Sequence, residues 1–240
     1  MRIALGAQAS PTQNLIAGGA QVSARNEDVA TDPYWANVVL LVGNDNAADG
    51  STTFADQSSG AHTITANGNV SYSDLLAPTG MTTSILSDGT GDFLSSASHA
   101  DWAMGSGDFT WEAYVYANGA YGGDRGIIST NGINLVFYHA VDFLKYYNGD
   151  NNIIGAAVGL AAWHHVAVCK GSGSTKMFID GTQTGSTYAD SGNYTQGILQ
   201  VGAYASTSSW KGNLCSVRMT KGIARYTADF TQPTLPLPIS

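Results

Sequence analysis

Two neighbouring segments of this chain have the pattern of a β-hairpin, and this pattern limits the fold more than any other feature of the sequence. Residues 163–169 (Trp-His-His-Val-Ala-Val-Cys) alternate between two sets of side chains with a period of two, which is typical of a half-buried strand. Glycine and serine at 171–174 form the turn, residues 177–179 return as a second strand, and Asp180-Gly181 is a strong hairpin signal. The sequence therefore predicts two adjacent strands here.

Strand patterns of the same kind recur over most of the chain, without a helical pattern of convincing length. The clearest is 108–116, whose alternate residues separate into two faces: Phe109, Trp111, Ala113 and Val115 on one, and Thr110, Glu112, Tyr114 and Tyr116 on the other. About a dozen strands follow one another, with turn signals roughly every 8–12 residues, which is typical of a sandwich. We therefore expect an all-β fold, a two-sheet antiparallel β-sandwich of the jelly-roll type.

The composition changes along the chain and indicates three parts. Residues 1–32 are polar and show no sustained period, so we expect an N-terminal arm or attachment segment there, with a disordered leader as the alternative. Residues 33–232 carry the strand patterns and form the predicted sandwich, and residues 233–240 form a Pro-rich C-terminal tail. The two cysteines, Cys169 and Cys215, lie in strand-like segments, where we expect two buried free thiols rather than a disulfide between adjacent strands.

The charge of the chain disfavours two classes of partner. The net charge is −8, from 18 acidic and 10 basic residues, and no run of Lys or Arg occurs. Nucleic acids and anionic membrane surfaces both require a basic patch, so we expect neither as a partner. The longest apolar stretch, 153–163, is shorter than the roughly 20 residues of a membrane span, so we expect no membrane insertion. No secretory signal follows Met1, and we expect synthesis in a cytoplasm with release by assembly or lysis.

A series of short motifs, in a fixed order, carries a resemblance to a known family. The motifs are Asp56 with Ser58 and Gly60, Asp88-Gly89 with Asp92-Phe93-Leu94, Asp108-Phe109-Thr110, Trp163-His164-His165-Val166-Ala167, Ile179-Asp180-Gly181, Trp210 with Gly212, Val217-Arg218, and Lys221-Gly222 with Ala224-Arg225-Tyr226. Over residues 34–232 they resemble the laminin-G-like branch of the concanavalin A-like lectin/glucanase superfamily. The closing Lys-Gly-Ile-Ala-Arg-Tyr segment resembles the version found in many bacteriophage structural proteins. The resemblance implies a concanavalin A-like sandwich, a fold that carries sugar binders, glycosidases and structural modules alike.

The sequence lacks the catalytic pattern that some of these relatives use. The glucanases carry a Glu-x-Asp-x-(x)-Glu strand, because glycoside hydrolysis needs two carboxylates about 5–5.5 Å or about 6.5–9.5 Å apart. The two glutamates of this chain, Glu27 and Glu112, have no acidic residue two positions away. The paired His164 and His165 point to opposite faces of their strand, so they cannot share a metal ion or a substrate. We therefore expect no enzymatic activity, and glycoside hydrolase is the least favoured alternative.

An Asp-rich loop region is the candidate metal site. Many relatives hold calcium near the rim of the sandwich, and the resemblance makes Asp45, Asp49 and Asp56 the candidate ligands, since calcium takes six to eight hard oxygens. Cys215 and Ser216 stand where relatives often carry further acids, and turn chemistry alone also explains the aspartates. We therefore expect no required cofactor, with calcium as the alternative.

A candidate sugar-binding surface lies on the face of strand 108–116 that points away from the predicted core. Lectin sites stack aromatic rings on sugars and bind the hydroxyl groups with polar side chains. Glu112, Tyr114 and Tyr116 share this face, and we expect Tyr138 and the loop residue Tyr121 to join them. The alternative is that a neighbouring subunit or a covering loop packs on this face.

Together these features predict a non-enzymatic virion structural protein, a capsid decoration or a tail or fibre component, that displays a lectin-like sandwich for adhesion to host surface glycans. Residues 1–32 would bind other virion proteins, and we expect a homo-oligomer, because many copies make weak sugar sites effective. After synthesis in the host cytoplasm, the protein would lie on the virion surface. The alternative is a free calcium-dependent carbohydrate-binding module or lectin.

Overall fold

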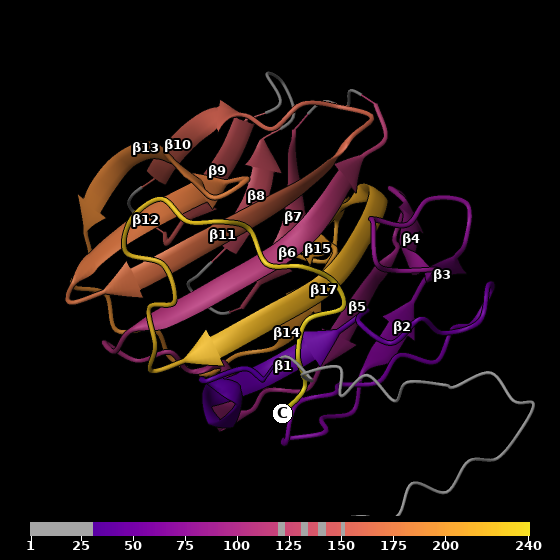
Figure 1. Ribbon diagram of the computed structural model, residues 1–240, viewed down its shortest axis with the longest axis horizontal. Coiled ribbons are helices and arrows are strands. Elements are labelled where there is room, and N and C mark those ends of the chain that lie inside the picture. Colours follow the sequence, from indigo (N-terminus) through magenta and orange to yellow (C-terminus); the bar gives the residue numbers. More distant parts are fainter. Residues whose placement is uncertain (1–30, 120–122, 131–133, 139–142, 150–151) are drawn as a thin grey trace, which may run out of the picture. The chain divides into compact units, whose positions relative to one another are not determined.

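The computed structural model of the protein describes residues 31–119, 123–130, 134–138, 143–149 and 152–240. The chain divides into two units, Met1–Ala30 and Thr31–Ser240, and the first of them, with most of the predicted N-terminal arm, lies outside the described residues. The second unit is an all-β, antiparallel, two-sheet sandwich, as the sequence predicts (Figure 1). The helices among the described residues are two 3-10 turns, η1 (Trp35–Asn37) and η2 (Ala100–Trp102), and neither is long enough to cross a membrane.

The front sheet, which faces the viewer in Figure 1, contains the predicted hairpin and the long strands. Its strands, in spatial order, are β13 (Thr182–Ala189), β12 (Ser174–Ile179), β11 (Trp163–Gly171), β6 (Phe109–Ala117), β17 (Lys211–Lys221), β4 (Ser84–Asp88) and β3 (Ser71–Ser73), and β1 (Val38–Val42) also pairs with β17. Because β6 lies between β11 and β17, Trp111 has Val168 and Met219 as its cross-strand neighbours. Such apolar cross-strand pairs are the unit that stabilises a sheet.

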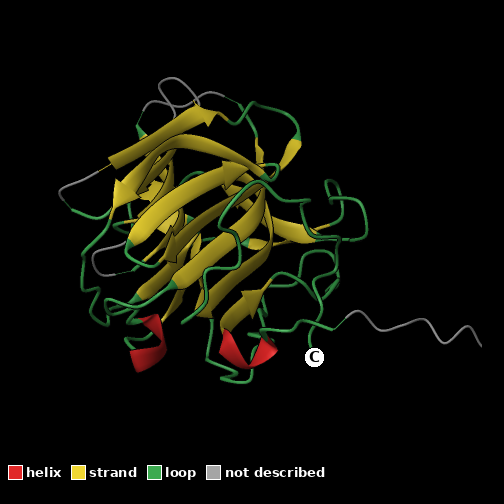
Figure 2. Cartoon of the chain, turned by 60° about the vertical axis from the view of Figure 1, so that its left-hand side comes forward, coloured by secondary structure: helices red, strands yellow, loops and turns green. Residues whose placement is uncertain are grey.

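The back sheet lies behind the front sheet in Figure 1 and completes the sandwich. Its strands, in spatial order, are β10 (Asn152–Ala157), β9 (Phe143–Tyr147), β8 (Asn134–Tyr138), β7 (Asp124–Ser129), β14 (Leu199–Val201), β5 (Phe93–Ser96) and β2 (Thr65–Asn67). A small separate hairpin pairs β15 (Ala203–Tyr204) with β16 (Ser208–Ser209). Figure 2 shows that strands (yellow) make up nearly all of the regular structure beside the two short helices (red).

The core lies between the two sheets, and the alternation along β6 is confirmed. The side chains predicted to face the core are all buried in the main apolar cluster: Phe109, Trp111, Ala113 and Val115. The back sheet contributes a matching apolar set: Ile127, Ile128, Leu135, Leu144 and Tyr146. The other face of β6, with Glu112 and Tyr114, points away from this core and is available for other contacts.

The predicted hairpin is also confirmed. β11 pairs with β12 as far as Gly171 opposite Ser174. β12 then turns into β13 through Asp180 and Gly181, whose φ angles are 51° and 81°. Two positive φ angles in a two-residue loop are what a type I′ turn requires, and the Asp-Gly pair accepts them with little strain.

Cys169 and Cys215 are both free and buried, as the sequence predicts. Burial raises the pKa of each thiol to about 12, so both stay protonated near neutral pH. They therefore act as small apolar side chains rather than as reactive groups.

The C-terminal segment, residues 222–240, crosses the outer face of the front sheet. Figure 1 shows it in yellow, passing in front of β11, β6 and β17. The Tyr226 and Phe230 rings stack with their centroids 3.5 Å apart and pack against Phe178 of β12. Further along, Leu237 is buried against β1. The Pro-rich tail is thus packed on the sandwich, and the segment covers part of the surface that the sequence assigns to sugar binding.

Candidate functional site

Glu112, the central residue of the predicted sugar-binding surface, is only 1% exposed. One of its carboxylate oxygens accepts a hydrogen bond from Arg218 Nε at 2.8 Å, and the other accepts from the Tyr226 hydroxyl at 2.8 Å and lies 3.0 Å from His165 Nε2. Burial alone would raise the pKa of Glu112, but Arg218 and His165 hold it well below its usual range. The carboxylate is therefore ionised, fully paired and out of reach of a sugar, which corrects the prediction for this residue.

Glu112 belongs to a larger buried charge network, made of Asp32, Glu112, His165, Arg218 and Arg225. Arg225 binds both carboxylate oxygens of Asp32, at 2.9 and 2.7 Å, and Arg218 Nη1 lies 3.0 Å from Oδ2 of the same group. Burial would raise the pKa of Asp32, but the hydrogen bond from Arg225 and the charge of Arg218 bring it below its usual value. The network joins the start of the described chain to β6 and β17, so its role is structural.

The four predicted tyrosines do not form one surface. Tyr114 is buried, and its hydroxyl donates to the carbonyl oxygen of Pro233, whereas Tyr116 is half-buried. Tyr138 belongs to β8 of the back sheet, so it does not share the face of Tyr114, which corrects the prediction. The side chain of Tyr138 and the whole of Tyr121 lie outside the described residues.

The covering segment leaves an open pocket beside Tyr114, named here the Tyr114–Trp163 pocket. It has a volume of about 480 Å³ and is lined by Pro78, Thr79, Gly80, Tyr114, Trp163 and residues 232–235. This volume falls within the roughly 300–1,000 Å³ that is typical of ligand sites. The Tyr116 and Trp163 ring centroids are 5.7 Å apart, so Tyr116 supports the aromatic wall of the pocket.

Close backbone contact fixes one wall of this pocket. Gly80 has a φ of 96°, which favours glycine, and a Cβ atom there would lie 2.2 Å from the carbonyl oxygen of Leu235. The hydrogen bond from Tyr114 to Pro233 holds the same segment from the sheet side. The pocket is therefore preformed, which lowers the entropy cost of binding a ligand.

The lining chemistry suits a neutral ligand that carries hydroxyl groups. Tyr114 and Trp163 offer aromatic surface, and Thr79, Gln232 and Thr234 offer hydroxyl and amide groups. None of the described residues that line the pocket is charged. Sugars present an apolar ring face together with hydroxyl groups, so they match this combination.

A second pocket, of about 530 Å³, lies where the C-terminal segment passes the turn between β11 and β12. Its charged side chains already have partners within the protein. Asp108 accepts a hydrogen bond from the Ser172 amide at 2.9 Å, and Lys176 donates to the Thr227 carbonyl at 2.6 Å. We therefore take the Tyr114–Trp163 pocket as the candidate binding site.

The predicted calcium ligands all lie in the connection between β1 and β2, but each carboxylate has its own hydrogen-bond partners. Asp45 accepts a hydrogen bond from the Tyr72 hydroxyl at 2.6 Å, and Asp49 accepts one from the Asp74 amide at 3.2 Å. Both oxygens of Asp56 accept hydrogen bonds from the loop that follows it. Among the residues that the structure describes, the three carboxylates do not form a common ligand group, so turn chemistry accounts for them.

Sequence reasoning missed most of the candidate pocket. The alternation identifies Trp163 only as the first residue of a strand. Its position opposite Tyr116 follows only when strands 109–117 and 163–171 are known to be neighbours in the sheet. The position of residues 232–235 carries no local signal, because it depends on the segment folding back over the sheet.

A laminin-G domain model, described as concanavalin A-like lectin/glucanases superfamily, matches residues 88–223. No curated protein matches the sequence significantly. Both findings concern the sequence, and the first covers β6, β11 and β17, the strands that carry Glu112, Trp163 and Arg218.

Several solved structures share the fold at low sequence identity. A Trypanosoma rangeli sialidase in complex with sialic acid has a TM-score of 0.59 and 12% identity, over 81% of this chain and 32% of that one. Domain 4 of AbnA, an extracellular arabinanase from Geobacillus stearothermophilus, in complex with arabinotriose, has a TM-score of 0.57 and 14% identity, over 78% of this chain and 94% of that one. The binding domain of botulinum neurotoxin DC in complex with rat synaptotagmin II has a TM-score of 0.54 and 12% identity, over 79% and 49% of the two chains. These similarities show the fold alone, and this chain spans about a third of the length of the sialidase.

Proposed function

The chain belongs to the concanavalin A-like lectin/glucanases superfamily, and we propose that it is a non-enzymatic module that binds carbohydrate through the Tyr114–Trp163 pocket. The observation that carries this proposal is the preformed, uncharged pocket with two aromatic side chains and several hydrogen-bonding groups. Domain 4 of AbnA, a neighbour in fold, forms a complex with arabinotriose, which supports a saccharide as the ligand class.

The pocket chemistry supports binding rather than hydrolysis. Cleavage of a glycosidic bond needs a pair of carboxylates at the scissile bond. The described residues that line the pocket include no acid, and Glu112 is buried and paired with Arg218. A saccharide held in the Tyr114–Trp163 pocket would therefore be recognised but not cut.

We propose further that the module is displayed on a virion, as a capsid decoration or a tail or fibre component. The resemblance of residues 221–226 to bacteriophage structural proteins supports this role, and the polar residues 1–32 would contact other virion proteins. Homo-oligomeric display on a particle would raise the avidity of a weak sugar site without any new contact.

A glycan array with the purified, full-length protein tests the sugar-binding proposal, with the mass in solution measured in parallel. Trp163→Ala removes an aromatic wall of the pocket and is expected to weaken binding by about tenfold or more. The matched control is Tyr204→Ala, a half-buried aromatic residue in the separate hairpin of β15 and β16. A control that binds like the wild type would assign the loss to the pocket.

Two results would change the proposal. A folded oligomer that binds no glycan, or a Trp163→Ala variant that binds as well as the wild type, would contradict the pocket assignment. Running the array with calcium and with a chelator distinguishes this proposal from the alternative of a free calcium-dependent lectin. Binding by a monomer that is lost on chelation would indicate that alternative.

A further inference from the structure

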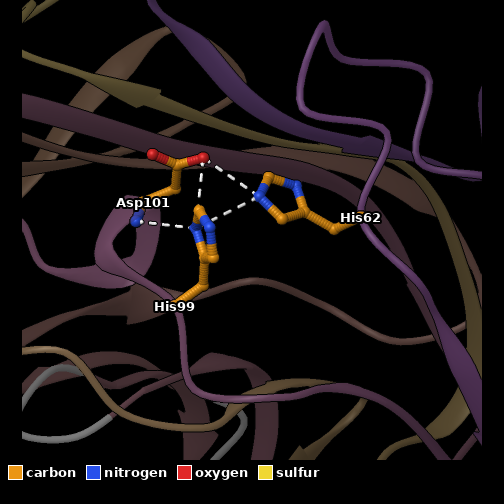
Figure 3. A group of neighbouring side chains, drawn as sticks. All are labelled: His62, His99 and Asp101. Carbon is orange, nitrogen blue, oxygen red and sulfur yellow. Dashed lines mark hydrogen bonds and ion pairs between the residues drawn. The ribbon is translucent and has the colours of Figure 1, made fainter.

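His62, His99 and Asp101, named here the His62 group, lie outside the Tyr114–Trp163 pocket and outside the buried charge network. Figure 3 shows the three side chains pointing toward one another, His62 from the loop between β1 and β2 and the other two from the start of η2. We infer that this group binds one divalent transition-metal ion, and that zinc fits its ligand atoms best. This inference is independent of the proposed sugar-binding function.

The spacing of the three ligand atoms matches one face of a tetrahedral site. His62 Nε2 lies 3.0 Å from Asp101 Oδ2 and 3.3 Å from His99 Nδ1, and the last two atoms are 3.3 Å apart. Zinc binds nitrogen and carboxylate oxygen at about 2.0–2.2 Å, which places tetrahedral ligand atoms about 3.3–3.5 Å from one another. A zinc ion therefore fits above this triangle with little movement of the side chains.

Hydrogen bonding within the group explains why a cation suits it. Asp56 Oδ2 lies 2.7 Å from His62 Nδ1, and because an ionised carboxylate only accepts, this nitrogen carries a hydrogen. If the ring is neutral, His62 Nε2 then carries a lone pair instead of a hydrogen, and this nitrogen faces Asp101 Oδ2 and His99 Nδ1. His99 Nδ1 is an acceptor too, since it accepts a hydrogen bond from the Asp101 amide nitrogen, 3.1 Å away. With His62 neutral, three acceptor atoms thus face one another and repel. A metal ion bound between them would remove this repulsion by coordinating all three.

Asp56 and Trp102 hold His62 in the orientation that a ligand needs. The contact of Asp56 with His62 Nδ1 is the carboxylate–histidine arrangement that usually supports a metal-binding histidine. Asp56 is itself held by the amides of Leu41 and Ser58, each at 3.0 Å. The His62 ring also lies 4.4 Å from the ring of the fully buried Trp102. Asp56, which the sequence suggests as a calcium ligand, is therefore better placed to support a ligand than to be one.

The ligand set and its exposure decide the class of metal. Imidazole nitrogen suits zinc, copper and nickel, whereas calcium requires six to eight oxygens. The His62 side chain is 9% exposed, that of Asp101 33% and that of His99 51%, so the group opens to solvent on one side. Three protein ligands with an open fourth position leave room for water or for a ligand from a partner. Binding costs His99 its hydrogen bond with the Asp101 amide, which the metal bond replaces.

The alternative without metal is an imidazolium. His62 would then carry a second hydrogen and donate to Asp56 and Asp101 at once, with the two carboxylates balancing its charge. This arrangement has no need of His99, whereas a zinc site uses His99 Nδ1 directly. Substitution of His99 therefore separates the two interpretations.

Calorimetric titration of the full-length, untagged protein with zinc, after treatment with a chelator, tests the inference. We expect one zinc ion per chain and at least about tenfold weaker binding for His99→Ala and for Asp101→Asn. Both side chains are partly exposed, so the variants are expected to fold. The matched control is His164→Ala, which removes another partly exposed histidine next to a carboxylate, Asp180, and should bind zinc like the wild type.

Cobalt substitution gives a second readout, because tetrahedral cobalt absorbs visible light strongly and its spectrum reports the ligand geometry. The proposal predicts this absorption in the wild type and its loss in His99→Ala. A folded wild type that binds neither ion, or His99→Ala and Asp101→Asn variants that bind zinc as tightly as the wild type, would overturn it.

Discussion

The buried charge network and the His62 group both contain histidine and carboxylate side chains, but they differ in the partners of these side chains and in their exposure. In the buried charge network, the carboxylate of Glu112 meets Arg218, His165 and the Tyr226 hydroxyl, and it is 1% exposed. In the His62 group, His62 Nε2, His99 Nδ1 and Asp101 Oδ2 lie 3.0–3.3 Å from one another on a side that is open to solvent.

The comparison teaches that residue type alone does not identify a site. Both groups combine imidazole with carboxylate, but arginines and a hydroxyl complete the first and close it, while the carboxylate of Asp101 in the second pairs with two histidines among the described residues. A closed network contributes to stability and specificity of the fold, and an open set of converging acceptors is suited to bind a cation.

The largest expected effect is that of Glu112→Gln, which breaks the closed network. The variant leaves Arg218 and Arg225 with one buried carboxylate fewer, and such a loss costs about 3–5 kcal/mol of the free energy of unfolding. Urea denaturation measures it. The control is Asp180→Asn, which alters the partly exposed pair of His164 and Asp180 and should cost less than about 1 kcal/mol. Equal costs would contradict the distinction.

Truncation at the N-terminus is expected to have the next largest effect on stability, and the test compares two deletions that differ by two residues. Removal of residues 1–30 leaves Asp32 in place, whereas removal of residues 1–32 deletes the carboxylate that pairs with Arg218 and Arg225. The longer deletion should lower the free energy of unfolding by about 3 kcal/mol relative to the shorter one. Thermal or urea unfolding of the two proteins would show it, and equal stability would exclude Asp32 as a structural anchor.

Acid should weaken the closed network gradually. Because the pKa values of Glu112 and Asp32 are lower in the folded protein than in the unfolded chain, their contribution is fully present above the unfolded values of roughly 4 and falls as the pH drops below them. We expect a loss of up to about 1.4 kcal/mol per pH unit for each such carboxylate. Unfolding curves from pH 6 downwards should therefore show the free energy of unfolding of the wild type approaching that of the Glu112→Gln variant. A difference in this free energy that stays constant with pH would argue against the depressed pKa of Glu112.

The smallest expected effect is that of His99→Ala on stability in the absence of metal. Its side chain is 51% exposed, and its hydrogen bond to the Asp101 amide caps a single 3-10 turn, so the cost should be about 0.5 kcal/mol. Urea unfolding in the presence of a chelator provides the measurement. A cost above about 2 kcal/mol would show that this histidine stabilises the fold in the way that the buried network does.

The strands could be predicted from the sequence because their signals are local. The alternation in 108–116 places Trp111 in the core, and Asp180-Gly181 marks the turn that joins β12 to β13. The same local pattern cannot say in which sheet a strand lies, so it does not reveal that Tyr138 belongs to the back sheet.

Both candidate sites depend on contacts between residues that are distant in the sequence, which local patterns do not encode. The Tyr114–Trp163 pocket exists because Pro233 returns over β6, 119 residues after Tyr114. His62 meets a histidine 37 residues away, without a regular spacing that would identify a metal site. The aspartate that the sequence did identify, Asp56, lies behind His62 as its support.

The most direct test of the distinction between the closed and the open group is a crystal structure of zinc-soaked protein with anomalous scattering recorded at the zinc edge. The account predicts one strong peak about 2.0–2.2 Å from His62 Nε2, His99 Nδ1 and Asp101 Oδ2, and no peak at Glu112 and His165. The absence of a peak at the His62 group, or a peak in the buried charge network instead, would contradict it.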